Sequence, residues 1–198
     1  MKIKNNFLFK KVNGFIKRVI IFFYPYSFPQ KKKGKLSAEK SILYPLCKGI
    51  GIDVGCGSEK IYQDAIGIDL TKKGDIGKYG SEKRQISNAD ISMSGDDLYL
   101  FADNVFDYVV SSHTLEHFSS PNKALLEWKR VLKKGGNMGI IVPDDKDLDT
   151  MKLDKTHKHA FTRKKLIKLI SDMEGFKIIK TGDAIKNWSF YIIAKKIK

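Results

Sequence analysis

Apolar and polar positions along the body of the chain follow two periods, one typical of buried strands and one typical of helices. Short apolar runs at Ile50–Val54, Ala65–Leu70, 104–112 and 138–142 have the length and composition of buried strands. After Pro121 the apolar positions recur every three or four residues, as on one face of a helix, at Ala124, Leu125, Trp128, Val131 and Leu132. Strands that alternate with helices predict an α/β fold with a mostly parallel sheet, whose ligands bind beyond the carboxyl ends of the strands.

The last third of the chain continues this alternation. We expect the helix described above to end at Lys133–Gly136. Thr162 is expected to cap a second helix that runs through Met173. Phe176–Ile179 and Trp188–Ala194 then predict two further strands, which complete the sheet.

Residues 1–35 differ from this body and are predicted to form an arm and a linker. Within residues 7–24, basic side chains fall on one side of a helix and bulky apolar side chains on the other. Because the charges interrupt the apolar run, this segment cannot span a bilayer or act as a cleavable export signal. Its apolar stripe fits an anionic membrane surface, or else the body of the protein or a second copy. The folded domain is expected to span residues 36–198.

The composition restricts the compartment and the partners of the protein. With 198 residues, 42% of them hydrophobic and 30% charged, the chain suits one globular domain and excludes wholesale disorder. The net charge is +15, but residues 1–40 carry 11 basic and 1 acidic side chains, whereas residues 41–143 carry 12 and 13. A protein that coats nucleic acid spreads positive charge over its folded body, so nucleic acid is not an expected partner. Two cysteines exclude a disulfide framework, and a cytoplasmic location is expected.

Two strand ends carry the residues of a nucleotide-type site. The first strand leads into Gly55-Cys56-Gly57-Ser58, a turn whose glycines let a ligand approach the backbone. The next strand ends at Asp69, and a carboxylate at that point can accept hydrogen bonds from both hydroxyls of a ribose. A lone GxG pattern is also found in turns that bind nothing. The two features together indicate an adenosine-containing ligand.

The ordered motifs resemble the class I S-adenosylmethionine-dependent methyltransferases, and specifically the type 11 methyltransferase domain. IDVGCGS is similar to the cofactor loop of that family and IGIDL to its ribose-binding strand end. LYLFADNVFDYVVSSHTLEHF and LLEWKRVLKKGGNMGIIVPD are similar to its fourth and fifth strands with their flanking segments. The resemblance implies a Rossmann-like sheet of seven strands, mostly parallel and flanked by helices, with the seventh strand antiparallel. It also implies S-adenosylmethionine as cofactor and S-adenosylhomocysteine as its product.

The same resemblance implies a set of cofactor-binding residues at the strand ends. They are Asp53, Gly55, Cys56, Gly57, Asp69, Leu70, Gly95, Asp97 and Ser111. Two departures from the family pattern stand out. Ser58 occupies the place of a frequent third glycine, and the short stretch before Asp69 implies a shortened or missing first helix. Two candidates remain for the contact with adenine. One is Asp90, expected to end the third strand, and the other is the loop Ser94–Asp97.

Methyl transfer to oxygen needs an aligned nucleophile and a base, and histidine has a suitable pKa at neutral pH. The candidate catalytic residues are His113, His157 and His159. His113 follows the fourth strand, where the family's active-site loop approaches the methyl group, and is expected to act as base or acceptor contact, or to orient the loop. His117 and Glu116, in the LEH turn, are expected to be structural. His157 and His159 lie on a connection that covers the substrate in this fold.

No metal is expected. A metal pair made of His157 and His159 would need carboxylate ligands of defined geometry. The acidic residues that keep this alternative open are Asp144, Asp145, Asp147 and Asp149. Otherwise these aspartates form a solvated acidic loop beside nearby lysines.

Three functions remain open at this level. The first is a methyltransferase (EC 2.1.1.-) that acts on an oxygen or nitrogen of a small molecule or of a surface-glycan or lipid-linked saccharide precursor. Such an enzyme would be cytoplasmic, peripheral at the inner face of the cell membrane through residues 7–24. The glycan assignment rests on the similarity of HKHAF and WKRVLKKGG to one branch of the family. The second is an RNA or protein methyltransferase, and the third is a non-catalytic assembly protein of the same fold. The acceptor and the oligomeric state stay unassigned.

Overall fold

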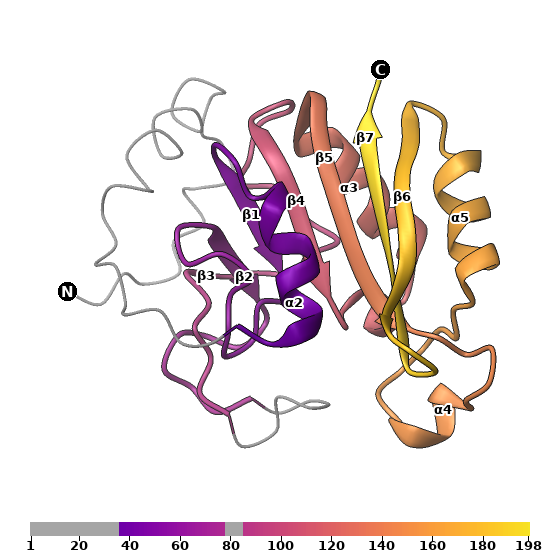
Figure 1. The fold of residues 1–198 in the computed structure, drawn as a ribbon. Coiled ribbons are helices and arrows are strands. Elements are labelled where there is room, and N and C mark those ends of the chain that lie inside the picture. Colours follow the sequence, from indigo (N-terminus) through magenta and orange to yellow (C-terminus); the bar gives the residue numbers. More distant parts are fainter. Residues whose placement is uncertain (1–35, 78–84) are drawn as a thin grey trace.

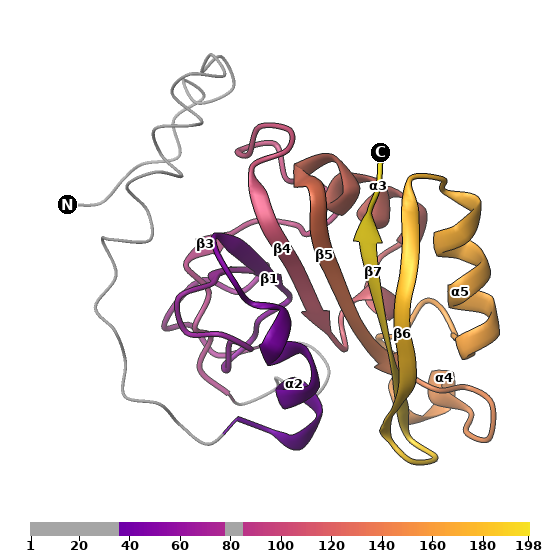
Figure 2. The ribbon, with the colours of Figure 1, turned by 45° about the horizontal axis from the view of Figure 1, so that its top comes forward.

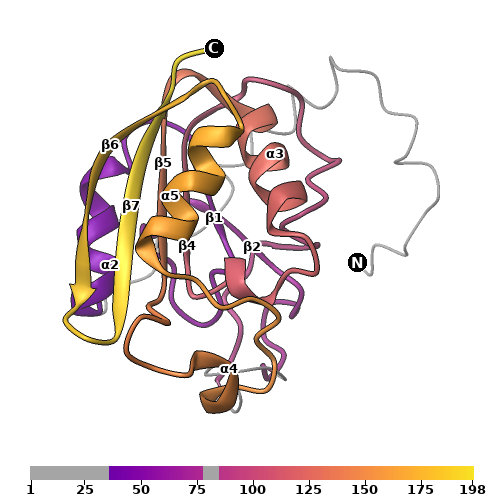
Figure 3. The ribbon, with the colours of Figure 1, turned by 90° about the vertical axis from the view of Figure 1, so that its right-hand side faces the viewer.

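The computed structural model describes residues 36–77 and 85–198, which form one sheet with helices on both faces (Figures 1 and 3). The strands are β1 (Gly51–Val54), β2 (Ile66–Asp69), β3 (Ile91–Ser92), β4 (Phe106–Ser112), β5 (Leu132–Pro143), β6 (Phe176–Ile185) and β7 (Ser189–Lys196). The α-helices are α2 (Ala38–Leu43), α3 (Pro121–Val131), α4 (Thr150–Leu153) and α5 (Arg163–Asp172), and the 3-10 helices are η2 (Tyr44–Leu46) and η4 (Leu115–His117). The predicted amphipathic arm at residues 7–24 lies outside the described residues.

The strand order is β3-β2-β1-β4-β5-β7-β6. Strands β1 to β5 pair in parallel, whereas β7 runs antiparallel between β5 and β6. This confirms the predicted seven-stranded, mostly parallel sheet with an antiparallel seventh strand. Val54 pairs with both Ile68 and Ser111, so the carboxyl ends of β1, β2 and β4 lie at the same edge. Helix α4 lies beyond the carboxyl ends of β4 and β5 (Figure 2).

Side chains alternate across the sheet and build a separate hydrophobic core on each face. The larger core packs under α3 and α5 and includes Ile52, Trp128 and Leu166 (Figure 3). The smaller core packs under α2 and includes Leu43 and Tyr108. Helix α2 approaches the sheet closely, because a Cβ atom on Gly139 would lie only 2.9 Å from Leu43. Helix α2 is therefore a fixed part of the domain.

Helix α3 ends earlier than the sequence predicted. Ser120 caps its start and Pro121 occupies its first turn, as expected, but the helix stops at Val131. Leu132 is already extended and pairs with Phe106 of β4. The glycine pair therefore lies inside β5, at a register shift in the β4–β5 pairing, and does not end the helix. Pairing with β4 overrides the local helix-ending signal.

The connection between β1 and β2 contains turns and no helix, so the predicted loss of the first helix is confirmed. Lys60 fills part of this space. Its side chain is 7% exposed, and its ammonium group donates to the carbonyl of Ala65 at 3.0 Å and to the carboxylate of Asp90 at 2.6 Å. Across residues 36–77 and 85–198, no helix is both long and apolar enough to cross a membrane.

Candidate active site

The predicted cofactor loop begins directly after β1. Gly55 and Gly57 have φ angles of +70° and +54°, a backbone region in which other L-residues are strained. A Cβ atom on Gly55 would also lie 2.0 Å from Oγ1 of Thr114. Both the conformation and the close approach therefore require glycine at position 55. The loop is further held by hydrogen bonds from the N–H groups of Gly55 and Cys56 to the carbonyl of Ile68, at 2.7 and 3.2 Å.

Asp69 lies at the tip of β2, next to this loop. One carboxylate oxygen accepts the N–H of Gly57 at 3.1 Å and the other accepts the N–H of Thr71 at 2.8 Å. A carboxylate offers about four acceptor positions, so each oxygen keeps capacity for a ligand hydroxyl. The side chain is only partly buried. The geometry therefore fits a carboxylate that holds the glycine loop and receives the ribose hydroxyls of a nucleoside.

Asp53 is buried in the middle of β1, on the sheet face under α2. Its carboxylate accepts the N–H of Ile61 at 2.6 Å, which closes the turn after the cofactor loop. Burial raises the pKa of Asp53 to about 6, although Lys40 and the hydrogen bond from Ile61 oppose the rise. Its geometry gives Asp53 a role in fixing the loop that follows β1.

Gly95 and Ser111 both contact the end of β1. A Cβ atom on Gly95 would lie 2.2 Å from Cγ1 of Val54, and the carbonyl of Gly95 accepts the indole N–H of Trp128 at 2.8 Å. Ser111 is buried and its hydroxyl donates to the carbonyl of Val54 at 2.9 Å. These two predicted residues therefore build the wall around the cofactor loop.

The remaining predicted cofactor residues differ in their exposure. Cys56 is 1% exposed, and burial raises the pKa of its thiol. Leu70, directly after Asp69, is 63% exposed, and Asp97 is exposed as well. Leu70 thus offers an apolar surface beside the ribose-side carboxylate. A role for each of these residues in binding the cofactor stays a prediction.

Asp90 does not end the third strand, as the sequence analysis expected. It precedes β3, and its carboxylate accepts the N–H of Gly67 at 2.9 Å while it pairs with Lys60. Its side chain is 2% exposed. The carboxylate therefore lies beside the middle of β2 and is committed to structural contacts. Of the two candidates for the contact with adenine, Asp90 is therefore excluded and the loop Ser94–Asp97 remains.

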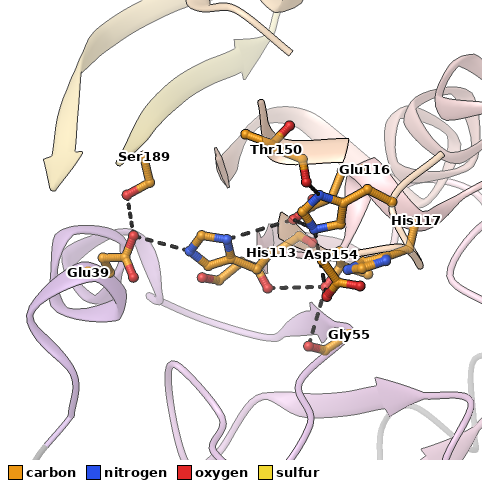
Figure 4. A network of polar contacts seen from close by, with 12 residues as sticks. Glu39, Gly55, His113, Glu116, His117, Thr150, Asp154 and Ser189 are labelled. Carbon is orange, nitrogen blue, oxygen red and sulfur yellow. Dashed lines mark hydrogen bonds and ion pairs between the residues drawn. The ribbon is translucent and has the colours of Figure 1, made fainter. Parts of the chain in front are cut away.

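His113 follows β4 in a strained conformation, with a φ angle of +52°. Its Nε2 lies 3.1 Å from Oε1 of Glu39 in α2, and its Nδ1 lies 3.7 Å from Oε1 of Glu116 in η4 (Figure 4). Burial lowers the pKa of His113, but the two carboxylates outweigh it and raise the pKa to about 9. An imidazole at this position would have to lose a proton before it served as a base. Among the predicted roles of His113, contact with the methyl acceptor is the one that a protonated imidazole can fill directly.

Glu39 holds His113 from a helix that the sequence analysis did not identify. The carboxylate also accepts a hydrogen bond from the hydroxyl of Ser189 in β7. Burial raises the pKa of Glu39, but the hydrogen bonds from His113 and Ser189 outweigh it and bring the pKa below its usual value. Trp188 lies beside His113, with ring centroids 6.4 Å apart. The serine before α2, a typical helix cap, could have revealed the helix, whereas no local signal joins Glu39 to His113.

The other two candidate catalytic histidines have different surroundings. The ring of His157 is 9% exposed, and its Nδ1 lies 2.9 Å from the carbonyl of Thr150. His159 lies at the surface, with Nε2 3.2 Å from the carbonyl of Ser119. The structure thus brings His113 and His157 near the same oxygen of Glu116, Oε1, and leaves His159 apart from them. Their catalytic roles stay predictions.

Thr114 connects the loop after β4, which carries His113, to the predicted cofactor loop. It directly follows His113, and its side chain packs against Gly55 of the cofactor loop. Its hydroxyl lies 3.4 Å from the carbonyl of Gly55. The predicted acceptor-side histidine is therefore one residue away from a direct contact with the predicted cofactor loop.

Comparison with known sequences gives a family match and a relative. A family model described as a methyltransferase domain matches residues 52–140. An uncharacterised protein of Methanocaldococcus jannaschii is 34% identical over 149 residues, which are 70% of this chain and 69% of that protein.

Solved structures show the same fold at low sequence identity. An S-adenosylmethionine-dependent methyltransferase from Archaeoglobus fulgidus has a TM-score of 0.56 and 19% identity, over 81% of this chain and 95% of its own. The 1,6-didemethyltoxoflavin-N1-methyltransferase of Burkholderia thailandensis was solved with 1,6-didemethyltoxoflavin and S-adenosylhomocysteine bound. It has a TM-score of 0.61 and 14% identity, over 81% of this chain and 77% of its own.

The sheet order, the glycine loop, the strand-end carboxylate and these similarities define the class. The chain belongs to the class I S-adenosylmethionine-dependent methyltransferases. Within that class it belongs to the family of the type 11 methyltransferase domain, whose cofactor is S-adenosylmethionine.

Proposed function

We propose that this protein transfers the methyl group of S-adenosylmethionine to an oxygen or nitrogen of a small molecule or of a surface-glycan or lipid-linked saccharide precursor. The observation that carries the proposal is the contact between Thr114 and Gly55, which holds the histidine after β4 beside the cofactor loop. This contact supports an acceptor site formed by the loop after β4, α2 and the β6–β7 turn.

The bound cofactor supplies an activated methyl group on a sulfonium. A lone pair of the acceptor atom forms the new bond to the methyl carbon, and the electrons of the carbon–sulfur bond stay on sulfur, which becomes a neutral thioether. When the acceptor is a hydroxyl, its proton passes to solvent water, because His113 already carries its own proton at neutral pH. The contribution of the chain is to align the acceptor and exclude water. His113, fixed by Glu39, is suited to hold an acceptor oxygen at the tip of β4.

Cofactor binding and methyl transfer are tested separately. Calorimetry with S-adenosylmethionine and S-adenosylhomocysteine measures binding, and Asp69→Asn should weaken it by roughly 10- to 100-fold, since a hydrogen bond to a charged group contributes about 1.5–3 kcal/mol. Asp75→Asn, at an exposed aspartate beyond β2, is the matched control and should bind like the wild type. Equal binding by wild type and Asp69→Asn would contradict the assigned cofactor site.

Methyl-labelled cofactor then identifies the acceptor class. Purified protein is incubated with hydroxylated small molecules, amines, saccharides, lipid-linked saccharides, RNA and protein, and labelled product is measured with each. Transfer to a small molecule or saccharide supports the proposal. Transfer to RNA or protein alone overturns it in favour of a macromolecular acceptor, and absence of cofactor binding favours a non-catalytic assembly protein.

We further propose that residues 7–24 hold the enzyme at an anionic membrane surface. The support is the sequence pattern of basic and apolar positions, since this segment lies outside the described residues. Binding to phosphatidylserine-containing vesicles should be lost when residues 1–30 are deleted, and vesicles of phosphatidylcholine alone are the control. Unchanged binding of the truncated protein would contradict this proposal.

A further inference from the structure

Three side chains from two different loops converge beside the candidate active site. Glu116 and His117 belong to η4, after β4, and His157 follows α4, after β5. One ligand atom from each lies within 4.8 Å of the ligand atoms of the other two. The rings of His117 and His157 are 4.8 Å apart between centroids and meet edge to face. Two imidazoles and one carboxylate are a ligand set typical of zinc sites.

Hydrogen bonds fix which nitrogen of each ring is free. Nδ1 of His157 lies 2.9 Å from the carbonyl of Thr150, which can only accept, so this nitrogen carries the proton. Nδ1 of His117 lies 3.1 Å from the carbonyl and 3.2 Å from the hydroxyl of Thr156. That hydroxyl donates to Asp154 at 2.6 Å, so it too accepts from His117. In the neutral state both rings therefore present the Nε2 lone pair, and such backbone support is the usual outer contact of a metal-binding histidine.

The surroundings of Glu116 are a second, independent observation that points to a bound cation. Its side chain is 2% exposed, and within the part of the chain that the structure describes neither carboxylate oxygen has a hydrogen-bond partner. The imidazole nitrogens of His113 and His157 lie near Oε1, at 3.7 and 4.0 Å. A buried carboxylate that accepts no hydrogen bond is costly unless cations compensate it, and a metal ion would do so besides the imidazolium of His113, 3.7 Å from Oε1.

A fourth ligand is available from the same loop. Oδ2 of Asp154 lies 4.0 Å from Nε2 of His157, while Oδ1 accepts both the N–H and the hydroxyl of Thr156. His159 does not join the cluster, because its Nε2 contacts the carbonyl of Ser119. The HxH pair considered from the sequence is therefore not the metal site. The sequence of residues 1–35 contains no His, Cys, Asp or Glu that could contribute.

We propose that Glu116, His117 and His157 bind a divalent transition-metal ion such as Zn²⁺, with Asp154 as fourth ligand. Zinc ligands lie about 2.0–2.2 Å from the ion, so the ligand atoms must draw together by roughly 1–1.5 Å, which side-chain rotation can provide. The ion would fasten the connection after β5 to the connection after β4. Backbone bonds already join them, from the N–H groups of Lys158 and His159 to the carbonyl of Glu116, at 2.9 and 3.1 Å.

The test uses the full chain without a histidine tag, freed of metal by a chelator. Zn²⁺ is titrated by calorimetry and by competition with a chromogenic chelator, and one ion per chain is expected. Glu116→Gln and His157→Gln should each weaken binding more than about 100-fold, since even loss of an outer-shell partner costs 10- to 100-fold. His159→Gln, two residues from His157 but outside the cluster, is the matched control and should keep wild-type affinity.

A measurement on the wild type guards against misfolded variants. Co²⁺ in place of Zn²⁺ should give the visible absorption of a tetrahedral site, and Zn²⁺ should displace it. Circular dichroism checks the fold of each variant. Absence of Zn²⁺ binding by the wild type, or equal loss of affinity in His159→Gln and His157→Gln, would overturn the proposal. In the first case Glu116 is compensated by the neighbouring imidazoles alone. Because the readout is metal binding, the result is independent of the proposed methyl transfer.

Discussion

Oε1 of Glu39 lies 3.1 Å from Nε2 of His113, although 74 positions separate the two residues in the sequence. Helix α2 brings the carboxylate to the carboxyl end of β4, and Ser189 of β7 holds it there with a further hydrogen bond. Three distant segments thus meet at the histidine that precedes the Thr114–Gly55 contact. The proposed acceptor side is therefore built from helix α2 as well as from the sheet.

Glu39→Gln should lower the pKa of His113. In the wild type two carboxylates raise that pKa to about 9, against the effect of burial. Removal of one opposite charge at this distance should lower it by roughly 1–3 units. Titration of the imidazole by NMR in chelator-treated protein measures the change, with the exposed Glu174→Gln as control. An unchanged pKa would show that Glu39 does not fix the charge of His113.

Gly55→Ala should destabilise the domain more than Gly74→Ala. Both glycines have positive φ, at +70° and +85°, so both substitutions add backbone strain of roughly 1–2 kcal/mol. At position 55 the new methyl group would also lie 2.0 Å from Oγ1 of Thr114, whereas nothing lies within 4 Å at position 74. Urea unfolding gives the free-energy difference and calorimetry the affinity for S-adenosylmethionine. Equal stability losses would argue against the close Gly55–Thr114 contact.

Asp53 should make the free energy of unfolding depend on pH. Burial raises its pKa from 3.8 to about 6, so between these values the folded state holds a proton that the unfolded state releases. The stabilising contribution of Asp53 is therefore largest below pH 3.8 and falls as the pH rises toward 6. The total fall is about 3 kcal/mol, at 1.36 kcal/mol for each unit of pKa.

Asp53→Asn should remove this pH dependence. Urea unfolding from pH 4 to pH 7 should show the wild type losing stability relative to the variant as the pH rises, whereas the exposed Asp75→Asn should parallel the wild type. A constant difference between wild type and Asp53→Asn across this range would mean that the carboxyl group titrates normally.

Lys60→Met should destabilise the domain far more than Lys73→Met. Both lysines pair with the buried carboxylate of Asp90, but the side chain of Lys60 is 7% exposed and that of Lys73 is 46% exposed. Loss of the buried partner should cost about 3–5 kcal/mol, because it leaves the buried carboxylate of Asp90 without its buried counter-charge. Loss of the exposed partner should cost about 1 kcal/mol or less. Chemical unfolding measures both, and Asp90→Asn added to Lys60→Met should recover part of the loss.

Local patterns predicted the first two strands and the candidate ligand-binding positions. Ile50–Val54 and Ala65–Leu70 were predicted from continuous apolar runs, which parallel strands need because both sheet faces are buried. The Gly55 turn and Asp69 were recognisable because a glycine-rich turn and a strand-end carboxylate are adjacent in the sequence to the strands that position them. The short β1–β2 stretch likewise revealed the missing helix.

Long-range contacts decided the rest. Pairing of Leu132 with Phe106 ended α3 early, and the ion pair with Lys60 drew Asp90 away from the cofactor side. The end of α3 and the position of Asp90 each depend on a partner residue that is distant in the sequence, so a short stretch of sequence cannot predict them.

The sequence by itself therefore determined the class of fold and indicated the glycine turn and strand-end carboxylate of the predicted cofactor site, because burial period and turn chemistry act over a few neighbouring residues. Only the tertiary structure decided which side chains meet across the sheet edge. Glu39 reaches His113, and His157 reaches Glu116, because helix α2 and the connection after β5 fold back onto the carboxyl end of β4. Contacts between residues so distant in the sequence depend on how whole helices, strands and loops pack against one another, and this packing exists only in the folded chain.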